Sequence, residues 1–420
     1  MNSLKGKRLL LLGGGSWGTA IKAFADANGI TLIATGNDPH GGIFDIADES
    51  CHVDSTDVDA MKWLIREKDI DGVYLGGSEK VLSCACQYVN ELGYPCYCTK
   101  EQWDAFENKL RFKSLLMKYG LPCARLYSLD SDELLYPLVT KPADGSGGEG
   151  FSVCRNREEL LKGYEAARQA SRSGTAMIEQ FVRNESVKVF YAFTDGDPHF
   201  LLLCDKSTHK YTAPESYVVT DYIFPSKHTD TFRKRYEATL FSMFRDTGIS
   251  NGTLWMEVFR DGDDYCFNEA GFRYMGNTSV YPVDYFTGIN QVASDITFAL
   301  TGHSQLYGHE ALIRKDVPQK NYYSMHYVHL SDGRIADIEG VEAFRQSTPE
   351  CVYLSVMKEV GDEIKNPHTI AQCFASVHFV FDTFEELELL VVKMHETIHV
   401  TDTNGQEMLV KREPLRVKNE

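Results

Sequence analysis

The first hundred residues alternate short apolar runs with amphipathic stretches of helical period. Alternation of this kind predicts strand–helix–strand units, which build a parallel sheet. The predicted strands are Arg8–Leu12, Thr31–Ala34, Val73–Leu75 and Pro95–Cys98, and the predicted helices between them are Thr19–Asn28, Asp57–Lys68 and Glu79–Leu92.

The rest of the chain changes its pattern twice. In the middle third, leucines and alanines at helical spacing predict helices, and runs of β-branched and aromatic residues predict strands. Beyond Gly302 the pattern is β-rich, with a closing helix and strand within Glu385–His399 and a mobile tail at Lys411–Glu420. The middle elements are the helices Arg157–Ser171, Thr229–Thr247 and Gly288–Thr301, the strands Val187–Phe193 and His199–Cys204, and a polar loop, Asp205–Pro225. The later strands are Tyr322–Leu330, Arg334–Glu339, Cys351–Met357 and Ser376–Phe381.

Length and charge narrow the class of protein. The 420 residues are 43% hydrophobic and 25% charged, which suits a globular protein of about three domains. The formal net charge of −17 disfavours nonspecific binding to nucleic acid or to an anionic membrane. The start of the chain has no signal-peptide pattern, no run approaches the roughly 20 apolar residues of a membrane span, and the 11 cysteines are scattered. We therefore expect a cytoplasmic protein with reduced thiols.

Residues 257–273 carry the strongest chemical signal. Two strand-like runs flank the acidic turn at residues 261–264, so a hairpin would make Glu257 and Glu269 cross-strand neighbours, with Arg273 close behind. Paired carboxylates are ligands that hold Mg²⁺ against nucleotide phosphates. An exposed acidic hairpin is the alternative.

A glycine-rich loop follows a lysine further upstream. Residues 137–153 predict a strand that ends near Lys141, a loop containing Ser146, Gly147 and Gly148, and a returning strand. Glycine lets backbone N–H groups approach a phosphate closely. A plain flexible hairpin is the alternative here.

These segments, in this order, resemble the ATP-grasp superfamily. The hairpin is similar to the magnesium-binding hairpin of that family, whose second strand usually ends Glu-x-Asn-x-Arg; here it is Glu269-Ala-Gly271-Phe-Arg273, with glycine at the asparagine position. The loop resembles the family's Lys-Pro plus glycine loop. The helix opening at Phe106–Lys113 resembles its Asp-Lys-x-x-x-Lys helix, with Asn108 at the aspartate position.

The resemblance implies roles for individual residues. Glu257 and Glu269 would be the metal ligands, and Arg273 and Lys141 would be catalytic. The implied nucleotide-binding residues are Lys109, Lys141, Ser146, Gly147, Gly148, Glu179, Gln180, Phe181, Val182 and Glu185, with Glu179 and the backbone of 180–182 facing the adenine and Glu185 the ribose. Glycine at position 271 leaves open whether one or two Mg²⁺ ions bind.

Two other motifs suggest different chemistry. Gly13-x-Gly15-x-x-Gly18, with Asp38 further on, matches a dinucleotide-binding turn. The same turn commonly opens the N-terminal domain of ATP-grasp ligases, and nothing downstream suggests a dehydrogenase, so we expect no nicotinamide cofactor. Cys84-Ala-Cys86 and Cys96-Tyr-Cys98 do not have the usual spacing of zinc ligands.

Together the patterns predict an α/β (α+β) ATP-grasp fold. We expect an N-terminal parallel-sheet domain (1–100), an ATP-grasp domain (101–305) with a lid at about 137–181, and a β-rich C-terminal domain (306–420). The resemblance implies an ATP-dependent ligase that joins a small carboxylate to an amine through an acyl phosphate, with ATP and Mg²⁺, or Mn²⁺ in its place, as cofactors. Its expected partners are small molecules, with no nucleic acid and no membrane, and a second copy of the chain in a homodimer. The alternatives are an ATP-grasp enzyme with another nucleophile, and a non-catalytic nucleotide-binding scaffold.

Overall fold

The structure is a computed structural model that describes residues 4–38, 41–145, 148–182, 185–212, 215–262, 264–275, 278–313, 317–365 and 369–415. The chain forms two compact units. Unit 1 is Met1–Asn184, Val189–Leu202 and Asp230–Leu312, and unit 2 is Glu185–Lys188, Leu203–Thr229 and Ile313–Glu420. Strands β9 and β10 therefore contribute residues to both units. The three-domain division remains a prediction.

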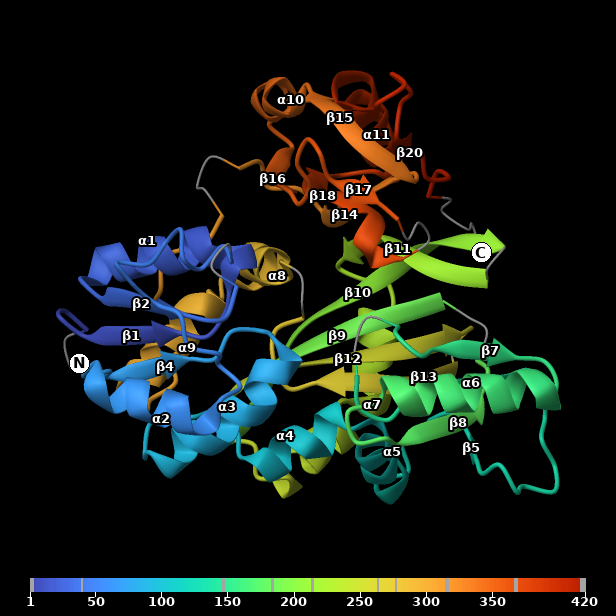
Figure 1. The fold of residues 1–420 in the computed structure, drawn as a ribbon, viewed down its shortest axis with the longest axis horizontal. Helices are drawn as coiled ribbons and strands as arrows, with labels where there is room; N and C mark the ends of the chain where they lie inside the picture. Colours follow the sequence, from blue (N-terminus) through green and yellow to red (C-terminus); the bar gives the residue numbers. More distant parts are fainter. Residues whose placement is uncertain are drawn as a thin grey trace. The chain divides into compact units, whose positions relative to one another are not determined.

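The N-terminal part of unit 1 is the predicted parallel sheet. Its strand order is β3-β2-β1-β4, and every neighbouring pair is parallel. Helix α1 covers one face, and α2 and α3 cover the other (Figure 1). The bounds are β1 Arg8–Leu11, η1 Gly15–Trp17, α1 Gly18–Asn28, β2 Thr31–Thr35, β3 Glu49–Cys51, α2 Val58–Glu67, β4 Gly72–Tyr74 and α3 Glu79–Glu91.

One strand of this sheet was predicted in the wrong place. Pro95–Cys98 is not a strand, since Pro95 has no N–H to donate and the Cys98 carbonyl accepts a hydrogen bond from Asn90 Nδ2 at 2.8 Å. The remaining strand is β3, at the edge of the sheet. Its polar residues Glu49 and Ser50 give it no apolar pattern.

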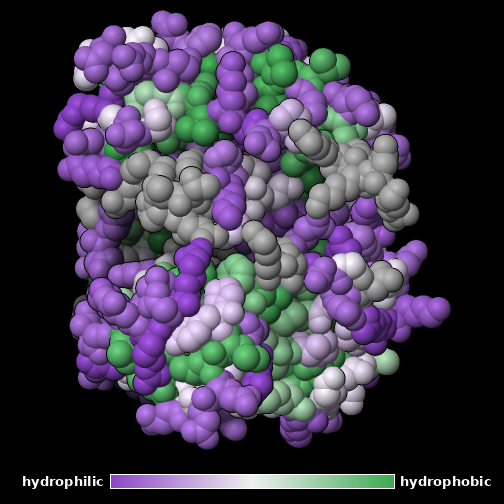
Figure 2. Space-filling view, turned by 90° about the vertical axis from the view of Figure 1, so that its right-hand side faces the viewer, coloured by the Kyte–Doolittle hydropathy of each residue, from purple (hydrophilic) through white to green (hydrophobic). Residues whose placement is uncertain are grey.

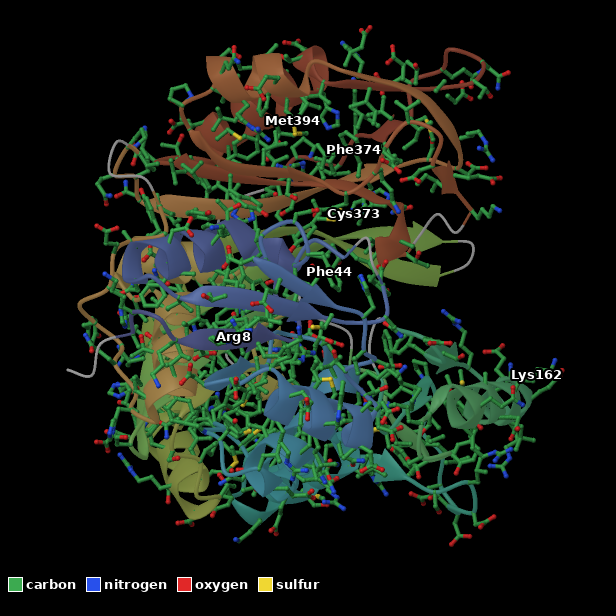
Figure 3. The ribbon with its side chains drawn as sticks, turned by 60° about the vertical axis from the view of Figure 1, so that its left-hand side comes forward. Arg8, Phe44, Lys162, Cys373, Phe374 and Met394 are labelled. Carbon is green, nitrogen blue, oxygen red and sulfur yellow. The ribbon has the colours of Figure 1, made fainter. Side chains whose placement is uncertain are left out.

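Two helices lead from this sheet to a small antiparallel one. Asn108 ends α4 and caps α5, because its Oδ1 accepts hydrogen bonds from the N–H groups of Leu110 and Arg111. The small sheet has the order β5-β8-β6-β7, and α6 packs on it through Leu160 while Lys162 extends away into solvent (Figure 3). The bounds are α4 Lys100–Glu107, α5 Lys109–Lys118, β5 Leu126–Tyr127, β6 Leu138–Pro142, β7 Ser152–Cys154, α6 Arg157–Ala170 and β8 Ala176–Gln180.

The third part of unit 1 contains the predicted acidic hairpin. Strands β12 and β13 form it, and they continue a sheet in the order β13-β12-β9-β10. Helix α7 packs on the hairpin through Phe232 and Tyr236, whose rings contact Tyr265 and Phe267. The bounds are β9 Glu185–Thr194, β10 Asp197–Thr212, α7 Thr229–Asp246, β12 Gly252–Asp261, β13 Asp264–Gly271, α8 Val280–Thr287 and α9 Gln291–Thr301.

Unit 2 is a β-rich unit with its own core. Its main sheet has the order β10-β11-β14-β18-β16, and Phe374 of β18 and Met394 of α11 lie in the same buried cluster (Figure 3). The bounds are β11 Glu215–Phe224, β14 Tyr322–Leu330, β15 Gly333–Glu339, α10 Val341–Ser347, β16 Cys351–Val356, β17 Glu363–Ile364, η2 Ile370–Gln372, β18 Cys373–Phe381, α11 Phe384–Thr397, β19 His399–Asp402 and β20 Leu409–Val410.

Two predictions for unit 2 were wrong. The predicted loop Asp205–Pro225 is mostly strand, because β10 runs on to Thr212 and pairs with β11. The predicted tail, Lys411–Glu420, is held in place at its start, since Arg412 lies 3.1 Å from Asp221 and 2.9 Å from Glu388, and residues 416–420 lie outside the described residues. Leu415 packs against the core.

The surface and the helices agree with the composition. Hydrophilic side chains cover most of the face in Figure 2, with smaller apolar areas between them. Among the described residues, no helix combines the length and the apolar character that a membrane span requires.

Candidate functional site

Two glutamates of unit 1 lie opposite each other across the β12–β13 hairpin. Glu257 pairs with Glu269 in antiparallel register. The exposed fraction of Glu257 is 6%, and Glu269 is half-buried. Like charges directly opposite each other destabilise a sheet. We call Glu257 and Glu269 the carboxylate pair; their side chains stand opposite each other on one face of the hairpin.

A β-bulge next to the carboxylate pair redirects the neighbouring side chain. Glu257 pairs with Glu269, but Val258 pairs with Phe267, so Asn268 is an extra residue in β13. A bulge interrupts the alternation of faces and turns a side chain in a new direction. The Oδ1 atom of Asn268 accepts a hydrogen bond from Lys141 Nζ at 2.9 Å. The bulge thus joins the hairpin to the lysine of the predicted loop.

Lys141 belongs to a buried charge cluster. Its Nζ lies 2.5 Å from Glu179 Oε1, and Lys113 Nζ lies 3.0 Å from Glu179 Oε2. The side chain of Lys113 has no exposed surface, and those of Lys141 and Glu179 are 9% and 5% exposed. Burial by itself would raise the pKa of Glu179, but attraction to Lys141 and Lys113 outweighs it and holds that pKa below its ordinary value. The cluster carries one net positive charge at the end of β6.

Arg273 is held by groups from four places in the chain. Its Nη2 pairs with Glu79 of α3, its Nη1 donates to the Tyr274 carbonyl at 2.8 Å, and its Nε lies 3.6 Å from Glu107 of α4. The guanidinium also lies over the ring of Trp255, 5.4 Å from the centroid. The residue is 7% exposed. In this structure the donors of Arg273 therefore face carboxylate and carbonyl groups of the protein.

Glu107 is an unusual carboxylic acid in this site. Burial raises its pKa to about 8, and the charge of Arg273 only partly opposes this rise. Its Oε1 atom accepts a hydrogen bond from the Phe272 N–H at 3.0 Å. Burial therefore favours the protonated form of Glu107 beside Arg273.

The predicted adenine segment is partly engaged with the protein. The N–H of Gln180 donates to the Arg125 carbonyl at 2.9 Å, and the N–H of Phe181 donates to the Pro137 carbonyl at 3.3 Å. Val182 follows β8 and is half-buried. The third predicted amide is that of Val182. Among the hydrogen bonds of the described residues, none is donated by its N–H group.

Lys109 lies beside the start of the glycine-rich loop. Its Nζ donates to the Gly145 carbonyl at 2.7 Å. Ser146 and Gly147 lie outside the described residues, and Gly148 has a φ of +79° with open space around its Cα. Glu185, the predicted ribose ligand, is exposed at the start of β9 and belongs to unit 2.

Sequence reasoning missed four residues of this site. Lys113 could have been found, because it is the second lysine of the Lys-x-x-x-Lys helix. Glu79, Glu107 and Asn268 had no such signal. Each meets its partner across 127 to 194 positions of sequence.

The glycine turn of the N-terminal sheet is filled by a tryptophan. A Cβ on Gly14 would lie 3.0 Å from Trp17 Nε1, and one on Gly77 would lie 3.0 Å from Trp17 Cη2. Trp17 is 3% exposed and donates a hydrogen bond to Tyr74 Oη at 2.6 Å. Trp17 therefore packs closely against the glycines on one side of the turn.

The residues fit a magnesium nucleotide better than an all-protein metal site. Among the described residues, no group of three or more His, Cys, Asp or Glu side chains is arranged to hold a metal ion. Mg²⁺ is commonly bound by one or two carboxylates, with phosphates and waters completing its six ligands. The carboxylate pair meets that requirement.

Comparison with known proteins identifies relatives that are named formate-dependent phosphoribosylglycinamide formyltransferases. The formate-dependent phosphoribosylglycinamide formyltransferase of Methanocaldococcus jannaschii is 28% identical over 288 residues, which are 64% of this chain and 71% of the relative. The enzyme of the same name from a Synechococcus strain is 29% identical over 188 residues, 42% of this chain and 48% of the relative. The chain thus spans about half the length of several curated relatives that it matches.

Solved structures of low identity share the fold. An L-amino acid ligase from Bacillus licheniformis superposes with a TM-score of 0.77 at 21% identity, covering 95% of this chain and 100% of that one. The biotin carboxylase domain of the Hydrogenobacter thermophilus 2-oxoglutarate carboxylase, solved with MgADP and bicarbonate, gives 0.74 at 18% identity, covering 96% and 91%. These likenesses confirm the predicted fold class.

The family itself is shown by the sequence. A family model described as "ATP-grasp domain" matches residues 106–319, just over half of the chain. The match includes the helix of Lys109, the glycine-rich loop, the charge cluster and the carboxylate pair. The chain belongs to the ATP-grasp family.

Proposed function

We propose that this protein is an ATP-dependent ligase that activates a carboxylate as an acyl phosphate and passes the acyl group to an amine, with release of ADP and phosphate. The observation that carries the proposal is the carboxylate pair of the β12–β13 hairpin, beside Lys141 and Arg273, in a chain of the ATP-grasp family. The names of the relatives support carboxylate and amine substrates. One is named for formate and glycinamide, and a structural neighbour for L-amino acids.

In this proposal, some site residues neutralise charge and others position the reacting groups. When bound, Mg²⁺·ATP supplies the phosphoryl group, and Glu257 and Glu269 would hold the metal ion. Lys141 and Lys109 would place positive charge beside the phosphates, where charge spreads during phosphoryl transfer. Arg273 would hold the developing acyl phosphate with its two-pronged donor geometry. That role requires the substrate to replace Glu79 or Glu107 at the guanidinium, since both contact it here.

The first experiment measures ADP release during incubation with candidate acids and amines. Glu257→Gln and Glu269→Gln should each lower the rate by orders of magnitude and leave the circular dichroism spectrum unchanged. Asp264→Asn is the matched control, because Asp264 lies on the same hairpin and its side chain is 87% exposed. Unchanged ADP release in both Gln variants at limiting Mg²⁺ would refute the assignment. A chain that binds ATP without any turnover would instead be a scaffold.

The second experiment concerns the loop that follows Lys141. Glycine density gives this loop little conformational preference, so we expect residues 144–150 to form part of a lid that closes on the nucleotide. Their amide hydrogen exchange should slow when Mg²⁺ and an ATP analogue are added. Lys141→Ala should weaken nucleotide binding roughly ten- to a hundredfold, the value of a charge-assisted hydrogen bond of about 1.5–3 kcal/mol. If the nucleotide does not change the amide exchange of residues 144–150, and Lys141→Ala binds nucleotide with the wild-type affinity, the loop is an ordinary hairpin.

A further inference from the structure

The indole of Trp255 fills the space beside Gly271. The two residues are paired in the β12–β13 register, two positions along each strand from the carboxylate pair. A Cβ on residue 271 would lie 2.6 Å from Trp255 Cε2 and 2.8 Å from Cζ2, and closer still to Nε1. Trp255 is 6% exposed. A side chain at position 271 and the indole at position 255 therefore exclude each other.

The carboxylate pair is bounded on both sides along the hairpin. On one side lie Trp255 and Gly271, which bring no side-chain oxygen. On the other side the amide oxygen of Asn268 accepts its hydrogen bond from Lys141. Between the Trp255–Gly271 and Val258–Phe267 pairs, the hairpin side chains that carry oxygen are those of Glu257, Glu269 and Asn268, and Asn268 already accepts the hydrogen bond from Lys141.

The charge near Trp255 also opposes a second cation. The guanidinium of Arg273 lies 5.4 Å from the centre of the indole ring. An aromatic face attracts a cation, so the indole helps to hold Arg273 at this place. A dication on that side of the carboxylate pair would meet both the indole, which offers no oxygen ligand, and a fixed positive charge.

We infer that Trp255 and Gly271 restrict the carboxylate pair to a single divalent cation, bound together with the nucleotide. The inference rests on the proposed function, because it assumes that Glu257 and Glu269 bind the cation of a metal–nucleotide complex. Mg²⁺ keeps near-ideal octahedral geometry and commonly uses one or two carboxylates with phosphates and waters. Two carboxylates, the phosphates of one nucleotide and waters complete the coordination of one Mg²⁺ ion. Trp255 and Gly271 together then determine the metal stoichiometry.

The test counts Mn²⁺ ions instead of turnovers. The protein is saturated with Mn²⁺ and a non-hydrolysable ATP analogue, and the bound Mn²⁺ and nucleotide are measured by equilibrium dialysis and electron paramagnetic resonance. We expect one Mn²⁺ per bound nucleotide in the wild-type chain and also in Trp255→Ala, which gains space but no oxygen ligand. Trp255→Ala/Gly271→Asn gains both, and it should bind a second Mn²⁺.

Controls separate this inference from the proposed function. Trp63→Ala is the matched tryptophan control, because Trp63 is 60% exposed on α2. Two Mn²⁺ per nucleotide in the wild-type chain, with normal ADP release, would overturn the inference and leave the proposed function standing. A folded double variant with one Mn²⁺ would also overturn it, and if that variant does not fold, the counts for the wild-type chain and Trp255→Ala decide. No saturable nucleotide binding at all would refute the proposed function itself.

Discussion

Replacing Lys113 with methionine should destabilise unit 1 strongly, although Lys113 has no exposed surface through which to touch a ligand. Methionine keeps most of the volume and removes the charge. At 3.0 Å, and with an effective dielectric constant of about 20, the attraction between Lys113 and Glu179 is roughly 5 kcal/mol. Methionine also avoids the free-energy cost of burying the lysine charge, and this offsets part of the lost attraction. Breaking a buried pair typically costs about 3–5 kcal/mol, and we expect the lower end because Glu179 keeps Lys141.

The assay is differential scanning calorimetry of the whole chain. A loss of about 3 kcal/mol in a unit of this size corresponds to a Tm lower by roughly 6–12 °C for the transition of unit 1. Lys162→Met is the matched control, because that lysine lies on α6 with 75% of its side chain exposed and pairs with exposed Glu158. Its Tm should not change measurably.

The pH dependence tests whether charge is the cause. The folded-state pKa of Glu179 is lowered, so the stability that its pairing contributes is present above the unfolded pKa of about 4.3. That contribution is lost as the pH falls through the folded value. The Tm difference between the wild-type chain and Lys113→Met should therefore narrow from pH 7 toward pH 3. A difference that is absent at pH 7, or that stays constant with pH, would show that the pair does not act as an ion pair.

Three other predictions follow from single features. Glu107→Gln should lessen the fall in Tm between about pH 4.5 and 8, because the pKa of Glu107 is raised to about 8 in the folded chain and is about 4.3 in the unfolded chain, so the wild-type acid loses stability across that range; identical Tm profiles would contradict the assignment. Gly340→Ala should lower the Tm of unit 2 far more than Gly405→Ala: both glycines have positive φ, but only at Gly340 would a Cβ overlap the Thr397 carbonyl. Calorimetric titration with NADH and NADPH should show no saturable heat, because the other chemical motifs of the chain lie in its ATP-grasp domain, and micromolar binding of either would refute this.

Local patterns were enough to predict the elements whose signals lie within a few residues. The β12–β13 hairpin was predicted from two apolar runs around an acidic turn, and strand Tyr322–Leu330 was predicted with the bounds that the structure has. Both are runs of apolar and aromatic residues that border clear turn residues. Pro95–Cys98 was wrong because an apolar run without a sheet neighbour forms no strand. β3 was missed because an edge strand needs no apolar run.

The partners of the site residues could not be predicted in the same way. Arg273 was expected to bind substrate, and its position in the motif indicates a functional arginine. Its pairing with Glu79 crosses 194 positions, and that of Lys141 with Asn268 crosses 127. Such contacts depend on how strands and helices pack, which no local window of sequence contains. The sequence therefore indicates which residues have functional side chains, and the fold determines which groups those side chains contact.

Gly271 shows how the two kinds of information combine. In the sequence, Gly271 departs from the Glu-x-Asn-x-Arg pattern, and the sequence alone shows only that an oxygen ligand is lost. The register adds that residue 271 pairs with Trp255, so the glycine is the counterpart of a large ring. Changing Gly271 alone would therefore create a steric clash before it restored any ligand. A gain of metal binding requires both positions to change, and the two substitutions should be strongly non-additive in Tm and in Mn²⁺ stoichiometry.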